Sequence, residues 1–158
     1  GQWVIQLAKA RGATVITTVG TQAKAALARE AGADHVLVMA DLAMADLPDA
    51  VRALVPGGVD VSYDGVGRDT FEATLACLRP RGLQVLFGGA SGQVPPFDLQ
   101  RLNALGSLFV TRPSLGAHIA TREELEWRAG ELFGMVAEGT LRARIGRTEE
   151  LRRARGIG

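Results

Sequence analysis

Short apolar segments alternate with helical segments along most of this chain, and this alternation constrains the fold more than any other feature. The apolar segments recur roughly every 20 residues, a spacing typical of successive βαβ units with a mostly parallel sheet. Five of them are predicted to be strands: Ala13–Val19, His35–Val38, Val59–Tyr63, Leu83–Phe87 and Ser107–Val110. Because strands this apolar need cover on both faces, we expect helices on both sides of the sheet.

Helical patterns fill the intervals between the predicted strands. One helix opens the chain, and others are predicted at Gln22–Ala31, Ala45–Leu54, Thr70–Leu78 and Leu99–Leu105. A long last helix follows Thr121, which together with Glu124 has the spacing of a capping box. Its buried face is expected to consist of the apolar residues at helical spacing: Leu125, Ala129, Leu132, Phe133 and Val136.

The whole pattern predicts an α/β fold with a doubly wound, mostly parallel sheet of the Rossmann type, and a length of 158 residues suits one domain. A net charge of +1 gives no electrostatic reason to expect nucleic acid or an anionic membrane as a partner. The single cysteine, Cys77, excludes an intramolecular disulfide and fits a reducing compartment. No apolar run reaches the length that spans a bilayer, so we expect a soluble cytoplasmic protein.

Three strand exits are the candidate ligand-binding segments, because open α/β sheets bind ligands outside the carboxyl ends of their strands. They are Gly20–Lys24, Asp64–Gly67 and Phe87–Ser91. Glycine at such positions lets the backbone approach a ligand closely. The alternative for each exit is a tight turn that needs glycine for its own geometry.

The first exit bears on which nucleotide is bound. The strand before it is almost wholly β-branched, Gly20 turns the chain, and Thr21 is the expected N-cap of the following helix. NAD-specific sheets usually place Asp or Glu at the end of the second strand to bind the ribose hydroxyls. Here that position is Gly20, and the next acid is Glu30. Lys24, one turn into the helix, is close enough to meet a 2′-phosphate; by composition alone it is a solvated surface lysine.

Six motifs occur in an ordered set along the chain. The chain opens with Gly1, Gln6 and Lys9 in the pattern G-x4-Q-x2-K, and then carries TVGTQAK, YDGVGRDTF, LFGGASG, LFVTRPSL and TREEL. This set resembles the zinc-free quinone oxidoreductases of the medium-chain dehydrogenase/reductase superfamily, the group that includes zeta-crystallin. The resemblance runs to about Thr148, so residues 1–148 are predicted to form a nucleotide-binding domain and residues 149–158 a divergent basic tail.

The resemblance also implies that parts of the family fold are absent from the chain. These are the first strand of the sheet, most of the phosphate loop and the GroES-like substrate domain, so we interpret the chain as a fragment or a truncated product. Since the absent strand is central in the order 3-2-1-4-5-6, the strands ending at Val19 and Tyr63 should face each other across a gap one strand wide. Strands in separate sheets, or a Lys24 side chain directed away from the strand ends, would overturn the inference that a dinucleotide lies across those ends.

The resemblance implies NADPH as the cofactor and hydride transfer to a quinone or an α,β-unsaturated carbonyl compound as the reaction. The implied cofactor-binding residues are Gly1, Gly20, Thr21, Lys24, Met39, Gly65, Val66, Phe87, Gly88, Gly89, Phe109, Val110 and Thr111. Met39 would meet the adenosine end, and an ordinary core methionine is the equal alternative. No catalytic side chain is assigned, because the family's acceptor lies between two domains. No metal is expected, because Cys77 has no Cys or His at zinc spacing.

The edge strand Ser107–Thr111 is predicted to pair with its counterpart in a homodimer, as the resemblance implies and as an exposed strand edge allows. Two alternative functions stay open. One is an enoyl reductase of the same superfamily. The other is a non-catalytic dimerisation or structural fragment, which the absent substrate domain and the divergent tail would suit.

Overall fold

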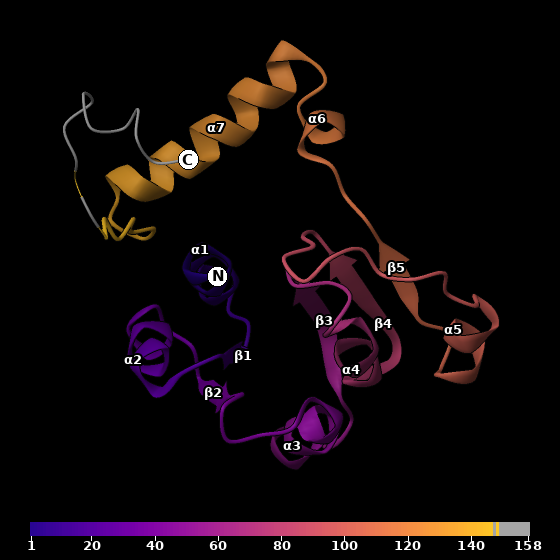
Figure 1. The fold of residues 1–158 in the computed structure, drawn as a ribbon. Coiled ribbons are helices and arrows are strands. Elements are labelled where there is room, and N and C mark those ends of the chain that lie inside the picture. The colour runs from indigo at the N-terminus through magenta and orange to yellow at the C-terminus, as the bar shows by residue number, and fades with distance from the viewer. Residues whose placement is uncertain (147, 149–158) are drawn as a thin grey trace, which may run out of the picture.

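The computed structural model describes residues 1–146 and 148, in which parallel strands alternate with helices (Figure 1). The strands are β1 (Ile16–Val19), β2 (His35–Val38), β3 (Val59–Asp64), β4 (Leu78–Leu86) and β5 (Phe109–Thr111). The helices are α1 (Gln2–Ala10), α2 (Gln22–Glu30), α3 (Leu47–Leu54), α4 (Phe71–Ala76), α5 (Gln100–Ala104), α6 (Leu115–His118) and α7 (Arg122–Ala137), with a 3-10 turn, η1 (Met44–Asp46), before α3. The predicted tail, residues 149–158, lies outside the described residues.

The described strands form two hydrogen-bonded sheets, and every pairing is parallel. One sheet pairs β1 with β2, and the other has the order β3-β4-β5. No ladder joins β1 to β3. The first strand and the strand at Val59 thus lie in separate sheets, which is one of the two observations expected to overturn a dinucleotide lying across the strand ends. This separation is also the pairing expected across a gap one strand wide, and the parallel strands alternating with helices confirm the α/β fold of the Rossmann type.

Helices cover both faces of the first sheet, as a doubly wound fold requires. Ile5 of α1 and Ala28 of α2 pack with Val15 and Val36 on one face. On the other face, Leu47 and Val51 of α3 form a cluster with a wider set of apolar residues: Ile16, Leu37, Met39, Leu42, Met44, Val59, Ala73 and Cys77. Because this set includes residues of β1, β2 and β3, the apolar core connects the two sheets where hydrogen bonds do not.

Helix α4 covers one face of the second sheet. Phe71 and Leu75 pack against Leu78 and Leu86 of β4 and against Leu108. The sequence predicted this strand to begin at Leu83, and that boundary is wrong. The strand begins at Leu78 and carries Pro80 within it, and the register between β3 and β4 shifts at this point. A register irregularity is a place where a strand tolerates proline, which otherwise removes a ladder hydrogen bond.

The long helix α7 begins as predicted but buries none of its residues. The capping box is confirmed: Thr121 Oγ1 accepts a hydrogen bond from the Glu124 N–H at 3.2 Å, and the Glu124 carboxylate accepts one from the Thr121 N–H at 3.3 Å. The predicted apolar face is wrong, since Phe133 is 72% exposed. Its contacts with the body of the chain include a polar one, the ion pair of Glu131 with Arg11 of α1 at 3.3 Å. Periodicity thus identified the helix, but the packing of the described residues buries no part of its predicted apolar face.

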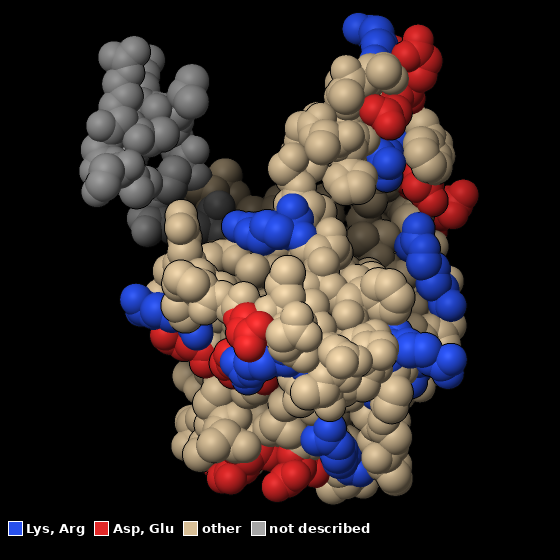
Figure 2. All heavy atoms as spheres, turned by 90° about the vertical axis from the view of Figure 1, so that its right-hand side faces the viewer, with Lys and Arg blue, Asp and Glu red and all other residues tan. Residues whose placement is uncertain are grey.

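Charges of both signs are interspersed on the face that Figure 2 shows. This distribution agrees with the near-neutral charge of the sequence and offers no large patch of one sign on that face. Across the described residues, we find no helix with the length and apolar character needed to cross a membrane.

Candidate functional site

The exits of β1 and β2 lie side by side at the carboxyl end of the first sheet. The Met39 N–H donates a hydrogen bond to the Val19 carbonyl oxygen at 2.8 Å. Beyond it, Gln22 Nε2 donates to Asp41 Oδ2 at 2.9 Å. The parallel register of the two strands brings these segments together, although about 20 residues separate them in the chain. The predicted site residues Gly20, Thr21 and Met39 therefore belong to one surface.

Lys24 lies exposed in the first turn of α2, beside this surface. Thr21 caps the helix as predicted, its Oγ1 accepting from the Lys24 N–H at 3.4 Å, and no acid occupies the first turn. Among the described residues, no ion pair or side-chain hydrogen bond engages the Lys24 ammonium group. A cation at the positive end of a helix dipole is mildly unfavourable by itself and favours an anion nearby. The arrangement leaves this cation available to a phosphate.

Asp41 is a residue that the sequence reasoning missed. That reasoning followed the chain from Gly20 and found no acid before Glu30, but β2 delivers Asp41 to the same exit. The signal was present in the order of elements, because an acid soon after a neighbouring parallel strand reaches the same sheet edge. The Asp41 carboxylate is engaged by the Gln22 side chain. Met39 packs against the apolar core, as expected for the alternative in which it is an ordinary core methionine.

The exits of β3 and β4 are joined more extensively, into a double loop of residues 64–69 and 87–92. The N–H groups of Phe87 and Gly88 donate to the Asp64 carbonyl oxygen at 2.9 and 3.3 Å. The Ala90 N–H donates to Gly65 O at 3.3 Å, and the Ser91 N–H donates to Val66 O at 2.9 Å. In the reverse direction, the Arg68 N–H donates to Gly92 O at 3.2 Å.

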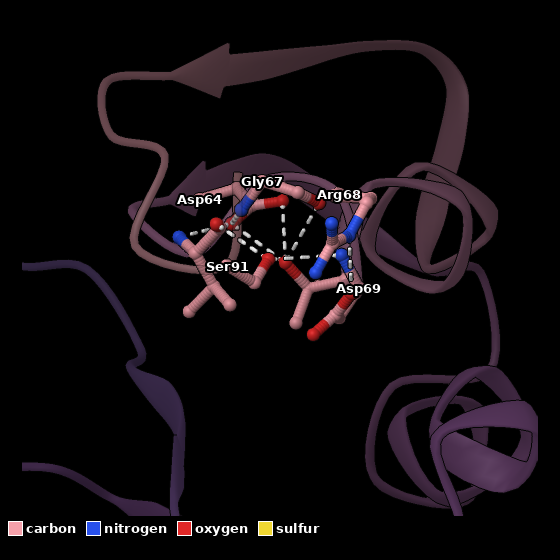
Figure 3. A network of polar contacts seen from close by, with 7 residues as sticks. Asp64, Gly67, Arg68, Asp69 and Ser91 are labelled. Carbon is pink, nitrogen blue, oxygen red and sulfur yellow. Dashed lines mark hydrogen bonds and ion pairs between the residues drawn. The ribbon is translucent and has the colours of Figure 1, made fainter. Parts of the chain in front are cut away.

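A buried carboxylate lies at the base of the double loop (Figure 3). Asp64 is 3% exposed, and its Oδ1 accepts hydrogen bonds from the N–H groups of Val66 and Gly67 at 2.8 and 3.1 Å. Thr70 Oγ1 of the α4 N-cap lies 2.8 Å from Oδ1 and 2.9 Å from Oδ2. Thr74 Oγ1 lies 3.2 Å from Oδ2. The carboxylate therefore holds the strand end, the turn and the start of α4 together.

Backbone contacts in the double loop leave no room for side chains at two of its glycines. A Cβ at Gly67 would lie 2.7 Å from Gly92 O, and the backbone there has a φ of +91°. A Cβ at Gly88 would overlap the carbonyl oxygen of Gly65. Both glycines are thus required by the packing of one exit on the other. This favours the turn interpretation of these glycines and leaves their contact with a ligand as a proposal.

Strand β5 places its three candidate residues beside β4. Phe109, Val110 and Thr111 are all exposed and pair with Leu83, Gln84 and Val85. The neighbouring Arg112 was missed by the sequence reasoning. Its guanidinium donates a hydrogen bond to the Leu86 carbonyl oxygen at 3.1 Å, directly before Phe87. Arg112 thereby connects the chain after β5 to the double loop.

The structure gathers most of the predicted site residues but not all of them. Gly20, Thr21, Lys24 and Met39 form one group, and a second group comprises Gly65, Val66, Phe87, Gly88 and Gly89, with β5 adjoining it. These groups lie at the carboxyl ends of separate sheets. Gly1 is the exposed N-cap of α1, and no described side-chain contact ties it to either group.

Within the described residues, no three His, Cys, Asp or Glu side chains come together in a way that could hold a metal ion. Cys77 is buried, and this burial raises the pKa of its thiol to about 11. A thiol in that state is a poor nucleophile and a poor metal ligand.

Comparison with known proteins identifies the relatives of this chain. A sequence profile of the zinc-binding dehydrogenases matches residues 1–129. Quinone oxidoreductase 1 of Escherichia coli (strain K12) is 47% identical over 141 residues, which are 89% of this chain and 42% of that protein. A 2-haloacrylate reductase of Burkholderia sp is 39% identical over 156 residues, 98% of this chain and 46% of the enzyme.

A solved mycobacterial structure, complexed with NADPH, is 48% identical and superposes with a TM-score of 0.88. The superposition covers 92% of this chain and 45% of that one. The chain thus spans less than half the length of the curated relatives described above.

Proposed function

This chain belongs to the zinc-binding dehydrogenase family and, within the medium-chain dehydrogenase/reductase superfamily, to the quinone oxidoreductases, and from this premise we propose that it is the NADPH-binding part of such an oxidoreductase. The proposed reaction is hydride transfer to a quinone or an α,β-unsaturated carbonyl compound. The observation that carries the proposal is the surface at the β1 exit. There an exposed Lys24 stands in the first turn of α2, and Gly20 occupies the place where NAD-specific sheets keep an acid.

The residues at both exits fit a dinucleotide. A Cβ at Gly20 would meet nothing within 4 Å, so the fold leaves open space at the position proposed for the ribose. Lys24 would bind the 2′-phosphate, with Thr21 beside it and Met39 toward the adenosine. The other proposed cofactor contacts are Gly1, Gly65, Val66, Phe87, Gly88, Gly89, Phe109, Val110 and Thr111. The separation of the two sheets is compatible with this, because the chain superposes closely on a structure that is complexed with NADPH.

Asp41 is the feature that opposes a preference for NADPH, since a carboxylate near the β1 exit would repel a 2′-phosphate. Its Oδ2 accepts a hydrogen bond from the Gln22 amide at 2.9 Å. A neutral amide does not cancel the charge of a carboxylate, so the proposed preference for NADPH requires that the attraction of the Lys24 cation for the 2′-phosphate outweigh the repulsion from Asp41.

Bound NADPH would supply the hydride, and the residues of this chain would bind and orient it. Phe87 is 47% exposed and would form a wall beside the nicotinamide ribose, with the backbone of Gly88 and Gly89 next to it. No described side chain is assigned as a general acid or base. Catalysis in this proposal rests on positioning the cofactor against the acceptor.

The acceptor is proposed by class only. The relatives named above reduce, by their names, a quinone in one case and 2-haloacrylate in the other. A haloacrylate carries a C=C bond conjugated to a carboxylate, so the second relative favours activated alkenes as a candidate class. Activity on either class belongs to the whole protein, of which this chain corresponds to less than half in these relatives.

Calorimetric titration of NADPH and NADH into the full-length protein containing this chain tests the proposal. We expect NADPH to bind about ten- to a hundredfold more tightly, because a charge-assisted contact to the 2′-phosphate contributes roughly 1.5–3 kcal/mol. Equal affinity, or tighter binding of NADH, would contradict the preference. Binding of neither nucleotide would contradict the function itself.

A homodimer through β5 is a separate part of the proposal. This strand ends the order β3-β4-β5, and all its residues are exposed. Analytical ultracentrifugation should show a dimer that Phe109→Asp converts to a monomer, because two like charges would meet across the axis. Phe133→Asp, on the exposed face of α7, is the matched control. A wild-type monomer would exclude the dimer.

A cytoplasmic location is also proposed, on the ground of the single cysteine.

A further inference from the structure

The turn after β3 uses its backbone donors internally. The N–H groups of Val66 and Gly67 donate to Asp64 Oδ1, the Arg68 N–H donates to Gly92 O, and the Asp69 N–H donates to Ser91 Oγ at 3.1 Å. A glycine-rich loop that binds phosphate must instead direct free N–H groups at the anion. In this turn the donors from Val66 through Asp69 are already occupied, so the turn does not have the form of a phosphate cradle.

We infer that Asp64 and Ser91 are positioning residues, which preform the double loop as one surface, and that its turn at residues 66–69 meets the central part of the dinucleotide by contact and not through phosphate-binding N–H groups. The inference rests on the proposed function, since it assumes that a dinucleotide lies there. It adds two residues that do not touch the ligand themselves. It also states how the exit of β3 would recognise the dinucleotide, namely by contact with its surface.

Asp64 holds the double loop from beneath. Its carboxylate is buried, is fixed by the Thr70 hydroxyl on one side, and accepts the two N–H groups of the turn on the other. An ionised carboxylate accepts such bonds roughly twice as strongly as a neutral acceptor does. A turn held in this way has its shape before a ligand arrives, which lowers the ordering cost of binding.

Ser91 connects the two segments of the double loop, and Figure 3 shows it within the network that contains Asp64 and Asp69. Its single hydroxyl serves both segments: Oγ donates to the Val66 carbonyl oxygen at 2.9 Å and accepts the Asp69 N–H at 3.1 Å. Its own N–H also donates to Val66 O. Val66, whose backbone these hydrogen bonds hold, has a side chain that is 41% exposed.

Two variants of the full-length protein separate positioning from general stability. Ser91→Ala removes one hydroxyl and keeps the backbone contacts, and Ser91→Thr restores the hydroxyl. We expect Ser91→Ala to raise the KM for NADPH about tenfold, which corresponds to the loss of one to two hydrogen bonds. The kcat and the midpoint temperature of unfolding should change much less. Ser91→Thr should recover the wild-type KM. A KM unchanged in Ser91→Ala, or a loss of kcat and midpoint together, would overturn the inference.

Hydrogen exchange tests the loop without reference to activity. The amides of Val66 and Gly67 should be protected in the nucleotide-free wild-type protein and should gain little protection from NADPH. In Asp64→Asn these two amides should exchange faster; where that variant does not fold, the wild-type measurement decides. Free exchange in the nucleotide-free protein would overturn the inference. A wild-type protein that shows the protection but binds no NADPH would instead contradict the proposed function.

Discussion

Lys9 and Asp34 form a forked ion pair, with Lys9 Nζ 2.9 Å from both carboxylate oxygens although 25 positions separate the residues in the chain. Asp34 Oδ2 also accepts the Val15 N–H at 2.7 Å. The pair therefore ties α1 to the start of β1 and to the turn that leads into β2. Lys9 belongs to the opening motif by which the chain resembles its family, and Gln6 of the same motif bonds both backbone groups of Arg142. In this structure the polar residues of that motif join segments of the fold.

Asp34→Asn should make the free energy of unfolding depend less on pH in the acid range. The Val15 N–H and the Lys9 ammonium lower the pKa of the Asp34 carboxyl below its ordinary value, so its ionised form stabilises the folded state. That contribution is complete above about pH 4 and is lost as the pH falls through the lowered folded-state pKa. Urea unfolding at pH 7, 5 and 3 should show a lower midpoint for the variant at pH 7 and a smaller further fall toward pH 3. Glu30→Gln, an exposed acid at the end of α2, is the control and should behave as wild type.

Lys24→Met should reduce the affinity for NADPH about ten- to a hundredfold and leave the affinity for NADH nearly unchanged, because only NADPH carries the 2′-phosphate. Arg29→Met removes the same charge from the last turn of the same helix and is the matched control. Calorimetric titration of both nucleotides into both variants gives the comparison. An equal loss for the two nucleotides, or the same loss in the control, would assign Lys24 to the solvated surface.

Gly67→Ala should destabilise the protein, whereas Gly20→Ala should not. The first substitution places a Cβ 2.7 Å from Gly92 O at a φ of +91°, and the second meets open space. Strain at such a backbone position costs roughly 1–3 kcal/mol, which thermal unfolding would detect. Gly20→Ala is then a clean probe of the site: with stability unchanged, a weaker affinity for NADPH would report that the ligand approaches the backbone there. An alanine at Gly67 with wild-type stability would contradict the packing of the double loop.

Cys77 should resist modification in the folded protein at pH 8. Burial raises the pKa of its thiol to about 11, so only a small fraction is thiolate at that pH. A colorimetric disulfide reagent should react at the rate of unfolding, and immediately once urea is added. Fast reaction without denaturant would show that the thiol is accessible.

The order of elements was predictable because it is a local property. Period-2 apolar segments, glycine and proline punctuation and capping residues are all written in short windows, so the boundaries of β2, the cap at Thr21 and the capping box of α7 could be read from the sequence. The family resemblance was predictable for the same reason, since its motifs are contiguous. Where a local signal competed with the pairing of strands, as at Pro80 in β4, the predicted boundary was wrong.

The sequence by itself determined a parallel α/β chain with its candidate ligand segments at the strand exits. Only the tertiary structure decided which exits join, because register between parallel strands places residues together that the chain keeps 19 or more positions apart. That is how Asp41 reaches Gln22 and how Ser91 reaches Val66 and Asp69. It also decided burial: no residue on the predicted apolar face of α7 is buried, while the carboxylate residue Asp64 is 3% exposed. The periodicity of apolar residues indicates which face of a helix is suited to burial. Only the packing of the folded chain decides whether another element covers that face.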